Sequence, residues 1–360
     1  MTIHKPQVSV VVPAYNAEAT LAETLASIQS QSLRDIEILV VDDGSTDRTA
    51  QIMAQIAADD RRVTALHQSN AGVATARNTG MAKASGQFAA FCDADDIWHP
   101  HKLERQVAAL RADPQAGLCY AWHRRIGQDD RILSSSPTPR IEGFVLHQHL
   151  EWNFISNGST VLVPMELARA TGFDACLHEA GNQGCEDYLF QLRIAHKHRF
   201  VCVPAYLVGY RQGAGGMSRG VDRMIRSHLQ TFAIMEAVLP EDAALKSVID
   251  QRRTQLLIEL SRNRLRRRDM TAAVSALLRA IAVGPRSVPG FLLDELKAGL
   301  HLMQPARTQN SPAKARLFHE LGADQADGAW SSRRSAQYLA TLSELDRRWE
   351  RGLAVAASSV

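Results

Sequence analysis

The chain of 360 residues lacks several features that would place it in a specialised class of protein. No apolar run approaches the roughly eighteen residues that a membrane-spanning helix needs. The N-terminus has no basic region followed by a long apolar core, so we expect no signal peptide. The net charge of only +3 is too small to argue for nucleic acid as a partner. The five cysteines are never spaced as Cys-x-x-Cys, which favours reduced thiols and a cytoplasmic location.

Two glycine-rich phosphate-binding patterns are also absent. Pro13-Ala-Tyr-Asn follows the first apolar run, where a dinucleotide-binding protein would carry Gly-x-Gly-x-x-Gly. The chain has no Gly-x-x-x-x-Gly-Lys-Ser/Thr, so the phosphate loop of nucleoside triphosphatases is missing. Any nucleotide must therefore be held by other means.

Short apolar runs alternate with helical patterns over the first hundred residues. The runs cover residues 8–12, 36–41, 63–67 and 88–91, and the patterns between them place apolar residues on one helical face. We predict that Ser45 or Thr46 caps the second of these helices. Strand and helix in this alternation predict an α/β protein with a mostly parallel, Rossmann-like sheet.

Polar clusters stand where three of these strands end. They are Pro13-Ala-Tyr15-Asn, Asp42-Asp-Gly-Ser and Asp93-Ala-Asp95-Asp96. Because ligands of parallel sheets bind beyond the carboxyl ends of the strands, we expect these residues around one ligand. Asp42 can accept from a base imide or a ribose hydroxyl, or it can be a turn aspartate satisfied by local backbone.

The acids after residue 92 carry the clearest chemistry. In extended chain Asp93 and Asp95 point to the same side, and two such charges repel unless a cation lies between them. Oxygen ligands suit Mg²⁺ or Mn²⁺. The alternative from the residues alone is a solvated acidic turn. Tyr15 can stack on a base or simply pack, and Arg77 can pair with a diphosphate or lie on a solvated helix face.

Four ordered motifs then point to a known family. They are Val-Ser-Val-Val-Val-Pro-Ala-Tyr-Asn at 8–16, Val-Val-Asp-Asp-Gly-Ser-Thr-Asp at 40–47, Asn-Ala-Gly-Val-Ala-Thr-Ala-Arg-Asn-Thr-Gly at 70–80, and residues 86–98 with Pro100, Lys102 and Leu103. This pattern resembles the inverting family 2 glycosyltransferases of the GT-A fold, of the kind that builds bacterial cell-surface glycans. The resemblance covers about a hundred residues, and residues 153–163 and 172–174 extend it.

The resemblance implies a nucleotide-diphosphate sugar as donor, with UDP the favoured nucleotide. Mn²⁺ or Mg²⁺ would be the cofactor, with Asp95 as its direct ligand and Asp93 at the ribose or the metal shell. Asp96 would support the loop. The residues implied at the donor nucleotide are Pro13, Tyr15, Asp42, Arg77 and Asp93.

A second chemical centre opens a predicted helix at Glu186-Asp187. Acids in a first helical turn are favoured by the helix dipole, which is the structural alternative. The resemblance implies that Asp187 is the catalytic base, which takes a proton from the acceptor hydroxyl in a single in-line displacement with inversion. Glu186 would position the loop or contact the acceptor.

A last short strand is predicted at residues 200–204, and Arg211 follows it. Arg211 and the glycine-rich segment 213–218 resemble the family's loop that covers the diphosphate. Many relatives carry a histidine in this loop, whereas this sequence has none between His198 and His228. The third protein ligand of the metal is therefore unassigned.

We predict a GT-A domain over residues 1–220, with a nucleotide-sugar half at 1–112 and an acceptor half at 113–220. A polar hairpin or loop is expected at 128–140. Residues 221–360 are predicted to be helical, with a tetratricopeptide-like pair around 255–283 and a linker at 304–312. The expected helices cover 224–239, 241–268, 271–283, 289–303 and 336–349.

The helical region carries a basic run, Arg262-Asn-Arg-Leu-Arg-Arg-Arg268. It is either a solvated helix face or a peripheral contact with anionic lipid on the inner face of the plasma membrane. Processive relatives carry Gln-x-x-Arg-Trp, but Leu345 stands where the glutamine would be, which favours transfer of a single sugar.

The resulting hypothesis is a hexosyl- or N-acetylhexosaminyltransferase that acts on a hydroxyl of a glycan or lipid-linked acceptor. Two alternatives stay open from the sequence. One is a sugar-phosphate nucleotidyltransferase, although its glycine-rich basic signature is missing near the first strand. The other is a non-catalytic nucleotide-sugar-binding protein built on a degenerate domain, which the intact acids argue against.

Overall fold

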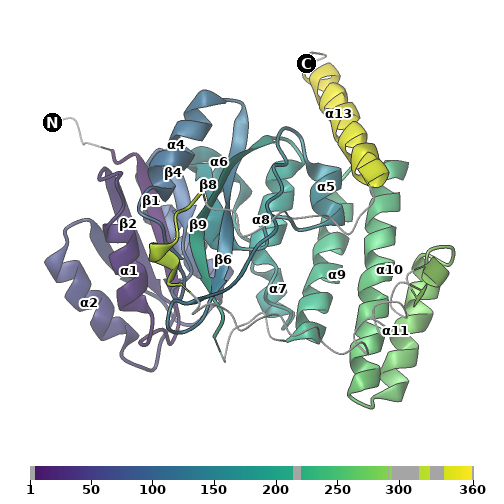
Figure 1. Ribbon diagram of the computed structural model, residues 1–360, viewed down its shortest axis with the longest axis horizontal. Helices are drawn as coiled ribbons and strands as arrows, with labels where there is room; N and C mark the ends of the chain where they lie inside the picture. The colour runs from purple at the N-terminus through teal and green to yellow at the C-terminus, as the bar shows by residue number, and fades with distance from the viewer. Residues whose placement is uncertain (1–4, 214–219, 291, 294–315, 325–335, 359–360) are drawn as a thin grey trace.

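A computed structural model describes residues 5–213, 220–290, 292–293, 316–324 and 336–358. A sheet flanked by helices forms one end of the molecule, and long helices form the other (Figure 1). The described strands make one nine-stranded sheet with the order β3-β2-β1-β4-β8-β6-β9-β5, in which β7 pairs with β6. The predicted α/β fold with a helical C-terminal region is confirmed.

The first four strands pair in parallel, in the order β3-β2-β1-β4. Val8 of β1 lies opposite Ile36 of β2 and Phe88 of β4. Both faces of β1 are buried, because Val10 packs on the side of α1 and Val11 on the side of α3. The elements are β1 (Val8–Ala14), α1 (Leu21–Gln29), β2 (Ile36–Asp42), α2 (Thr49–Asp59), β3 (Val63–His67), α3 (Val73–Lys83) and β4 (Phe88–Phe91).

The second half of the sheet is mixed. β8 runs antiparallel to both β4 and β6, β9 runs parallel to β6, and β5 and β7 add antiparallel pairs. Parallel pairing therefore dominates the first four strands and not the whole sheet. The elements are β5 (Ile97–Trp98), α4 (Lys102–Ala112), β6 (Ala116–Ile126), β7 (Ile132–Ser135), α5 (Leu146–Glu151), η1 (Gly158–Thr160), β8 (Val161–Pro164), α6 (Met165–Thr171), α7 (Cys176–Glu179), α8 (Glu186–Ala195) and β9 (Arg199–Arg211).

Two local predictions are corrected. The last strand is not a short segment at 200–204, because β9 continues to Arg211 while β6 pairs along its whole length. Helix α2 is not capped by Ser45 or Thr46, since it begins at Thr49 and those two residues instead bind Asn16 of the neighbouring loop. The hairpin expected at 128–140 is present as the β6–β7 pair.

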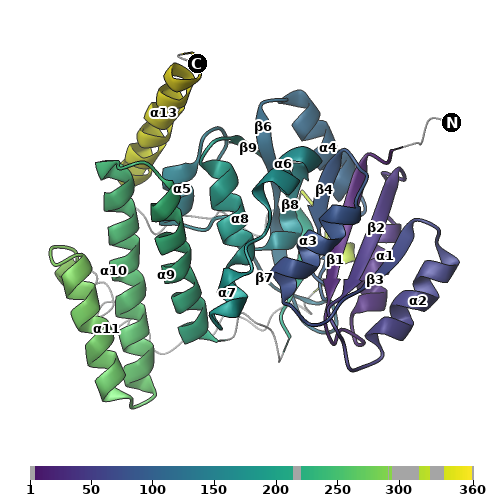
Figure 2. The same cartoon turned by 180° about the vertical axis from the view of Figure 1, so that it is seen from behind.

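The C-terminal helices share the hydrophobic core of the sheet domain. Ile225 and Phe232 of α9 and Leu342 of α13 are buried in the cluster that holds Tyr188 and Leu189 of α8. α10 and α11 form the predicted helical pair at the far end of the molecule, as both views show (Figures 1 and 2). The helices are α9 (Val221–Val238), α10 (Ala243–Arg266), α11 (Met270–Val283) and α13 (Ala336–Ser358), with a short η3 at Phe318–Glu320. The predicted linker at 304–312 and most of the helix at 289–303 lie outside the described residues.

Helix α13 is fixed to the sheet domain through one buried carboxylate. Asp346 accepts hydrogen bonds from the backbone N–H groups of His147 (2.7 Å) and Gln148 (3.3 Å) at the start of α5. It also contacts Nδ1 of His147 at 2.9 Å and accepts from Nε2 of Gln148 at 3.0 Å. Of the helices that the structure describes, none is long and apolar enough to cross a membrane.

Candidate active site

The acidic turn after β4 is held from several elements. The N–H of Asp96 donates to the carbonyl of Asp93 at 3.0 Å, which closes the turn. Thr20 and Thr24, at the start of α1, donate their hydroxyls to the carbonyl of Ala94 at 2.8 and 3.0 Å. The parallel β1–β4 pairing brings these residues together, because α1 follows the neighbouring strand.

Asp96 is the internal support of this turn. It is fully buried, and it accepts from Nδ2 of Asn157 (3.1 Å), Oγ of Ser159 (2.6 Å) and the backbone N–H of Arg211 (3.0 Å). Burial raises its pKa well above the ordinary range. Its side chain is satisfied inside the protein, so it is unavailable to a ligand.

Asp93 and Asp95 are the acids that remain partly exposed. Oδ1 of Asp93 pairs with Nη2 of Arg77 at 2.6 Å. Burial, together with the charge of Asp93, raises the pKa of Asp95 to about 6. Within the described residues, no group of three His, Cys, Asp or Glu side chains could hold a metal by itself. Two carboxylates nevertheless fit Mg²⁺-type ions, which keep waters and take their other ligands from substrate phosphates.

Arg77 sits on α3 with its guanidinium buried beside the acids. Its Cζ lies 5.1 Å from the ring centre of Phe173, which stacks on Phe190 of α8 at 4.3 Å. Burial alone would lower the pKa of Arg77, but the carboxylates of Asp93 and Asp187 reverse this effect and raise it. The arginine is thus permanently charged and faces both acidic centres.

Asp187 and Glu186 open α8, as the sequence predicts. A Cβ added to Gly158 would lie 3.3 Å from both Nη2 of Arg77 and Cβ of Asp187, so both side chains border the same glycine. Burial raises the pKa of Asp187 to about 6, although Arg77 lowers it. Glu186 is buried, and both its carboxylate oxygens accept from the N–H of Gly184 at about 3 Å. Glu186 therefore holds the turn before α8.

The end of β2 forms the other side of the site. Asp42 is buried; Oδ1 accepts from the N–H of Ser45 at 3.0 Å, and Oδ2 lies 3.2 Å from Nδ1 of His67. Asp42 therefore has both a local turn bond and a second oxygen near a partly exposed histidine. Pro13 is buried within β1, and Tyr15 beyond it is 53% exposed, with its ring available for stacking.

Arg211 differs from its expected place in a loop. It is the last residue of β9, and its side chain is 1% exposed. Nε donates to the carbonyl of Asp95 at 2.8 Å, and Nη1 donates to the carbonyls of Gly127 (3.0 Å) and Gln128 (3.1 Å). Its guanidinium therefore bonds to the protein itself and ties the acidic turn to the β6–β7 turn.

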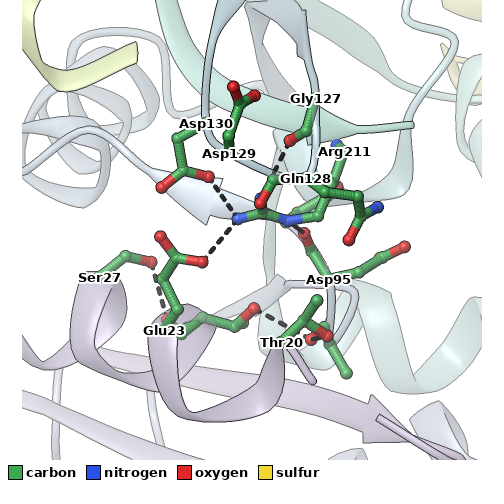
Figure 3. A network of polar contacts seen from close by, with 12 residues as sticks. Thr20, Glu23, Ser27, Asp95, Gly127, Gln128, Asp129, Asp130 and Arg211 are labelled. Atoms are coloured by element: carbon green, nitrogen blue, oxygen red, sulfur yellow. Dashed lines mark hydrogen bonds and ion pairs between the residues drawn. The ribbon is translucent and has the colours of Figure 1, made fainter. Parts of the chain in front are cut away.

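Two further acids complete the arginine network. Nη2 of Arg211 contacts Glu23 of α1 at 2.8 Å and Asp130 at 2.6 Å (Figure 3). The hydrogen bond with Asp130, followed by burial, raises the pKa of Glu23 to about 7. Residues 214–218 of the predicted diphosphate loop lie outside the described residues.

Sequence reasoning missed the residues whose hydrogen bonds position the turns of the site. Ser159 accepts from the N–H of Asp93 at 3.0 Å while it donates to Asp96, and Asn157 caps the short helix that carries it. Asp43 accepts from the N–H groups of Ala71 and Gly72 at 2.8 and 2.9 Å, which fixes the turn into α3. The Asn157-Gly-Ser-Thr segment carries an N-cap signal that could have indicated this short helix.

Comparisons with known proteins identify relatives of this chain. Residues 9–163 match the family model described as glycosyl transferase family 2. An uncharacterized glycosyltransferase of Haemophilus influenzae is 40% identical over 193 residues, or 53% of this chain and 72% of the relative. The glycosyltransferase GlyA of Streptococcus pneumoniae is 30% identical over 220 residues, or 59% of this chain and 32% of the relative. TuaG of Bacillus subtilis, a putative teichuronic acid biosynthesis glycosyltransferase, is 42% identical over 108 residues, or 30% of this chain and 43% of TuaG. The chain thus spans well under half the length of several curated relatives.

Two solved structures share the fold. Residues 1–349 of TarS from S. aureus, in complex with UDP-GlcNAc, superpose with a TM-score of 0.62 at 19% identity, and the match covers 82% of this chain and 86% of TarS 1–349. The mannosyltransferase PcManGT from Pyrobaculum calidifontis, in complex with GDP-Man and Mn²⁺, gives a TM-score of 0.56 at 24% identity. The match covers 85% of this chain and 83% of PcManGT. The motifs at the strand ends match the family model, and this chain covers most of the Haemophilus influenzae relative. Together with the shared fold, these matches show that the chain belongs to glycosyl transferase family 2.

Proposed function

We propose that this protein transfers a single sugar from a nucleotide-diphosphate sugar to a hydroxyl of a glycan or lipid-linked acceptor, with inversion. The observation that carries the proposal is the meeting of Arg77 and Asp187 at Gly158, with Asp93 bonded to the same arginine. These side chains come from α3, from the turn after β4 and from α8, which lies far from the other two in the sequence. They combine the positive charge of Arg77, the candidate metal-binding carboxylate of Asp93 and the candidate base Asp187 beyond the carboxyl ends of the strands.

The donor would bind along the ends of β1, β2 and β4. Asp42 and the exposed ring of Tyr15 suit the nucleoside, with Pro13 shaping the end of β1. Asp95 and Asp93 would hold Mn²⁺ or Mg²⁺, which supplies positive charge to the leaving diphosphate. Arg77 keeps Asp93 oriented and adds a permanent charge beside it. The relatives' ligands support a nucleotide sugar, and we favour a UDP-sugar because TarS was solved with UDP-GlcNAc.

Asp187 would act as the base. Its carboxylate takes the proton of the acceptor hydroxyl while that oxygen bonds to the anomeric carbon and the bond to the diphosphate breaks on the opposite side. A pKa of about 6 leaves the group ionised near neutral pH and basic enough to receive the proton. Glu186 supports this role indirectly, because its bonds to Gly184 fix the start of α8.

We further propose that residues 1–220 form the transferase domain, with donor binding in 1–112 and acceptor binding in 113–220. The similarity to TuaG, a putative teichuronic acid biosynthesis glycosyltransferase, supports a place in surface polysaccharide synthesis. We propose a cytoplasmic enzyme that contacts the inner face of the plasma membrane through residues 262–268, where a lipid-linked acceptor would be available.

The test is sugar release or transfer with several nucleotide sugars, with and without Mn²⁺. Asp95→Asn and Asp187→Asn should each lower kcat by about a hundredfold or more. Asp59→Asn, which changes an exposed acid of α2, should leave the rate unchanged. Full activity in either site variant contradicts the assigned roles. Nucleotide-sugar binding without any turnover would support the non-catalytic alternative.

A further inference from the structure

Helix α11 turns its large apolar side chains outward. The buried positions on the side that packs against α10 are small residues, Ala273, Ala276 and Ala280, which are at most 4% exposed. Leu277 and Val283 are partly buried on the same side. The backbones come close enough for Oγ of Ser261 in α10 to donate to the carbonyl of Ala273 at 2.8 Å. A helix of a globular protein ordinarily buries its large aliphatic residues and exposes polar ones.

The outward residues form one stripe. Met270, Val274, Leu278 and Ile281 follow one another at spacings of four, four and three, which keeps them on one helical face. Their exposed fractions are 58%, 52%, 61% and 43%. Leu265, at the end of α10 just before the connecting turn, is 51% exposed as well. We name these five residues the α11 apolar stripe.

The surroundings of the stripe are strongly basic. Residues 262–290 contain seven arginines and a single acid, Asp269. That acid is used locally, because its Oδ1 accepts from the N–H of Ala272 at the start of α11. The three arginines of the turn, Arg266, Arg267 and Arg268, are exposed, and so are Arg279 and Arg286.

The position of α11 leaves this surface accessible at the edge of the fold. The α10–α11 pair lies at the end of the molecule opposite the β3 edge of the sheet (Figures 1 and 2). α11 therefore presents its face away from the acidic turn and from α8. A large flat partner could reach it without covering the candidate active site.

We propose that the α11 apolar stripe and its arginines form an interfacial membrane-binding surface. The stripe would enter the boundary between headgroups and acyl chains of an anionic bilayer, and the arginines would contact the lipid phosphates. A second copy of this chain is a poorer partner. A twofold interface would place the arginines of one copy opposite those of the other, and each copy has only one acid in this segment to offset their repulsion. The inference deepens the proposed membrane contact of residues 262–268 and rests on that part of the proposed function.

The experiment is co-sedimentation of the full chain with vesicles, without nucleotide sugar. Vesicles of phosphatidylglycerol mixed with phosphatidylcholine should bind the protein, and pure phosphatidylcholine vesicles should bind it at least about tenfold less tightly. Leu278→Glu should weaken binding to the anionic vesicles about tenfold or more, and raised salt should weaken it further. Leu133→Glu on β7 is the matched control, because Leu133 is also 61% exposed but lies outside the basic segment. It should bind like the parent.

Three results would overturn the proposal. One is equal binding of Leu278→Glu and Leu133→Glu, and another is absence of binding to anionic vesicles. The third is a dimer in size-exclusion chromatography that Leu278→Glu dissociates, which would assign the stripe to a second copy. Donor hydrolysis without vesicles should be unchanged in Leu278→Glu, since α11 lies at the end of the molecule away from the sheet (Figures 1 and 2). If the parent lacks hydrolysis but binds vesicles, the transferase proposal fails while the membrane surface stands.

Discussion

Two opposing effects set the pKa of Asp187. Burial disfavours its charge, and the nearby Asp93 adds to this effect, while Arg77 on the other side of Gly158 favours the ionised form. The balance raises its pKa to about 6. A base with this pKa is ionised at neutral pH yet still accepts a proton as the acceptor hydroxyl reacts. A fully solvated carboxylate would be a weaker base.

This environment predicts the pH dependence of transfer. At saturating donor and metal, kcat should be constant above about pH 7 and should fall as pH decreases through 6, because Asp187 becomes protonated. Below that pKa the slope should approach tenfold per pH unit. The measurement is a pH profile of the parent and of Asp187→Asn, whose residual rate should not show this fall.

The control for that profile is Glu179→Gln, an exposed acid on the preceding helix. Its profile should match that of the parent. A decline that persists unchanged in Asp187→Asn would assign the titration to another group and contradict the role of Asp187.

At the scale of elements, the acidic turn is built by its neighbours. Helix α1 binds it through Thr20 and Thr24, η1 binds it through Ser159, and β9 binds it through Arg211. Each contact leaves Asp93 and Asp95 partly exposed while it removes freedom from the backbone between them. Orientation of paired carboxylates before the metal arrives reduces the ordering cost of binding.

Arg211→Met should destabilise the protein by about 3 kcal/mol, because it leaves the largely buried Asp130 without its cation, whereas Glu23 is 47% exposed and contributes less. It also leaves the carbonyls of Gly127 and Gln128 without this donor. Chemical denaturation measures the change. Mn²⁺ affinity, read by thermal shift, should fall in the same variant because the carbonyl of Asp95 loses its anchor.

Arg105→Met is the matched control for the arginine network. Arg105 pairs with Asp324 at 2.9 Å on the surface, where both side chains are at least a third exposed. Its loss should cost no more than about 1 kcal/mol. Equal stability of Arg211→Met and Arg105→Met would show that the buried network contributes nothing beyond a surface pair.

At the scale of the whole molecule, the helical region and the sheet domain share one hydrophobic core. Ile225, Phe232 and Met235 of α9 are at most 4% exposed, and α9 contacts the helix that carries Asp187. Asp346 of α13 caps α5, and Tyr188 of α8 donates its hydroxyl to the carbonyl of His149 in α5. The candidate base therefore depends on helices beyond residue 220 for its support.

A fragment of residues 1–220 should accordingly be less stable than the full chain, although the motifs of the family all lie within it. Removal of α9 uncovers Tyr188 and Leu189, which we expect to produce dye-binding hydrophobic surface and aggregation. Size-exclusion chromatography and dye fluorescence compare the two proteins. A monomeric fragment with the unfolding temperature of the full chain would contradict this dependence.

Much of the fold of residues 1–112 could be predicted from the sequence. Runs such as residues 8–12 and 36–41 become buried parallel strands because their side chains are apolar on both faces. The opening of α8 at Glu186 follows from its apolar spacing and first-turn acids. The extent of β9 could not be predicted from its own residues, because it depends on pairing with β6, more than seventy residues earlier.

The sequence alone determined which residues carry charge at the strand ends and in what order they follow the strands. Strand periodicity and strand-end position are local properties, so Asp42, Asp93 and Asp95 could be placed before any contact was known. The position of Asp187 in a first helical turn is local in the same way, and its role came from the family resemblance. Only the tertiary structure decided what those charges face. Arg211 binds the protein itself, Asp96 is buried, and α11 exposes its aliphatic stripe, because burial and hydrogen-bond partners are set by segments distant in the chain.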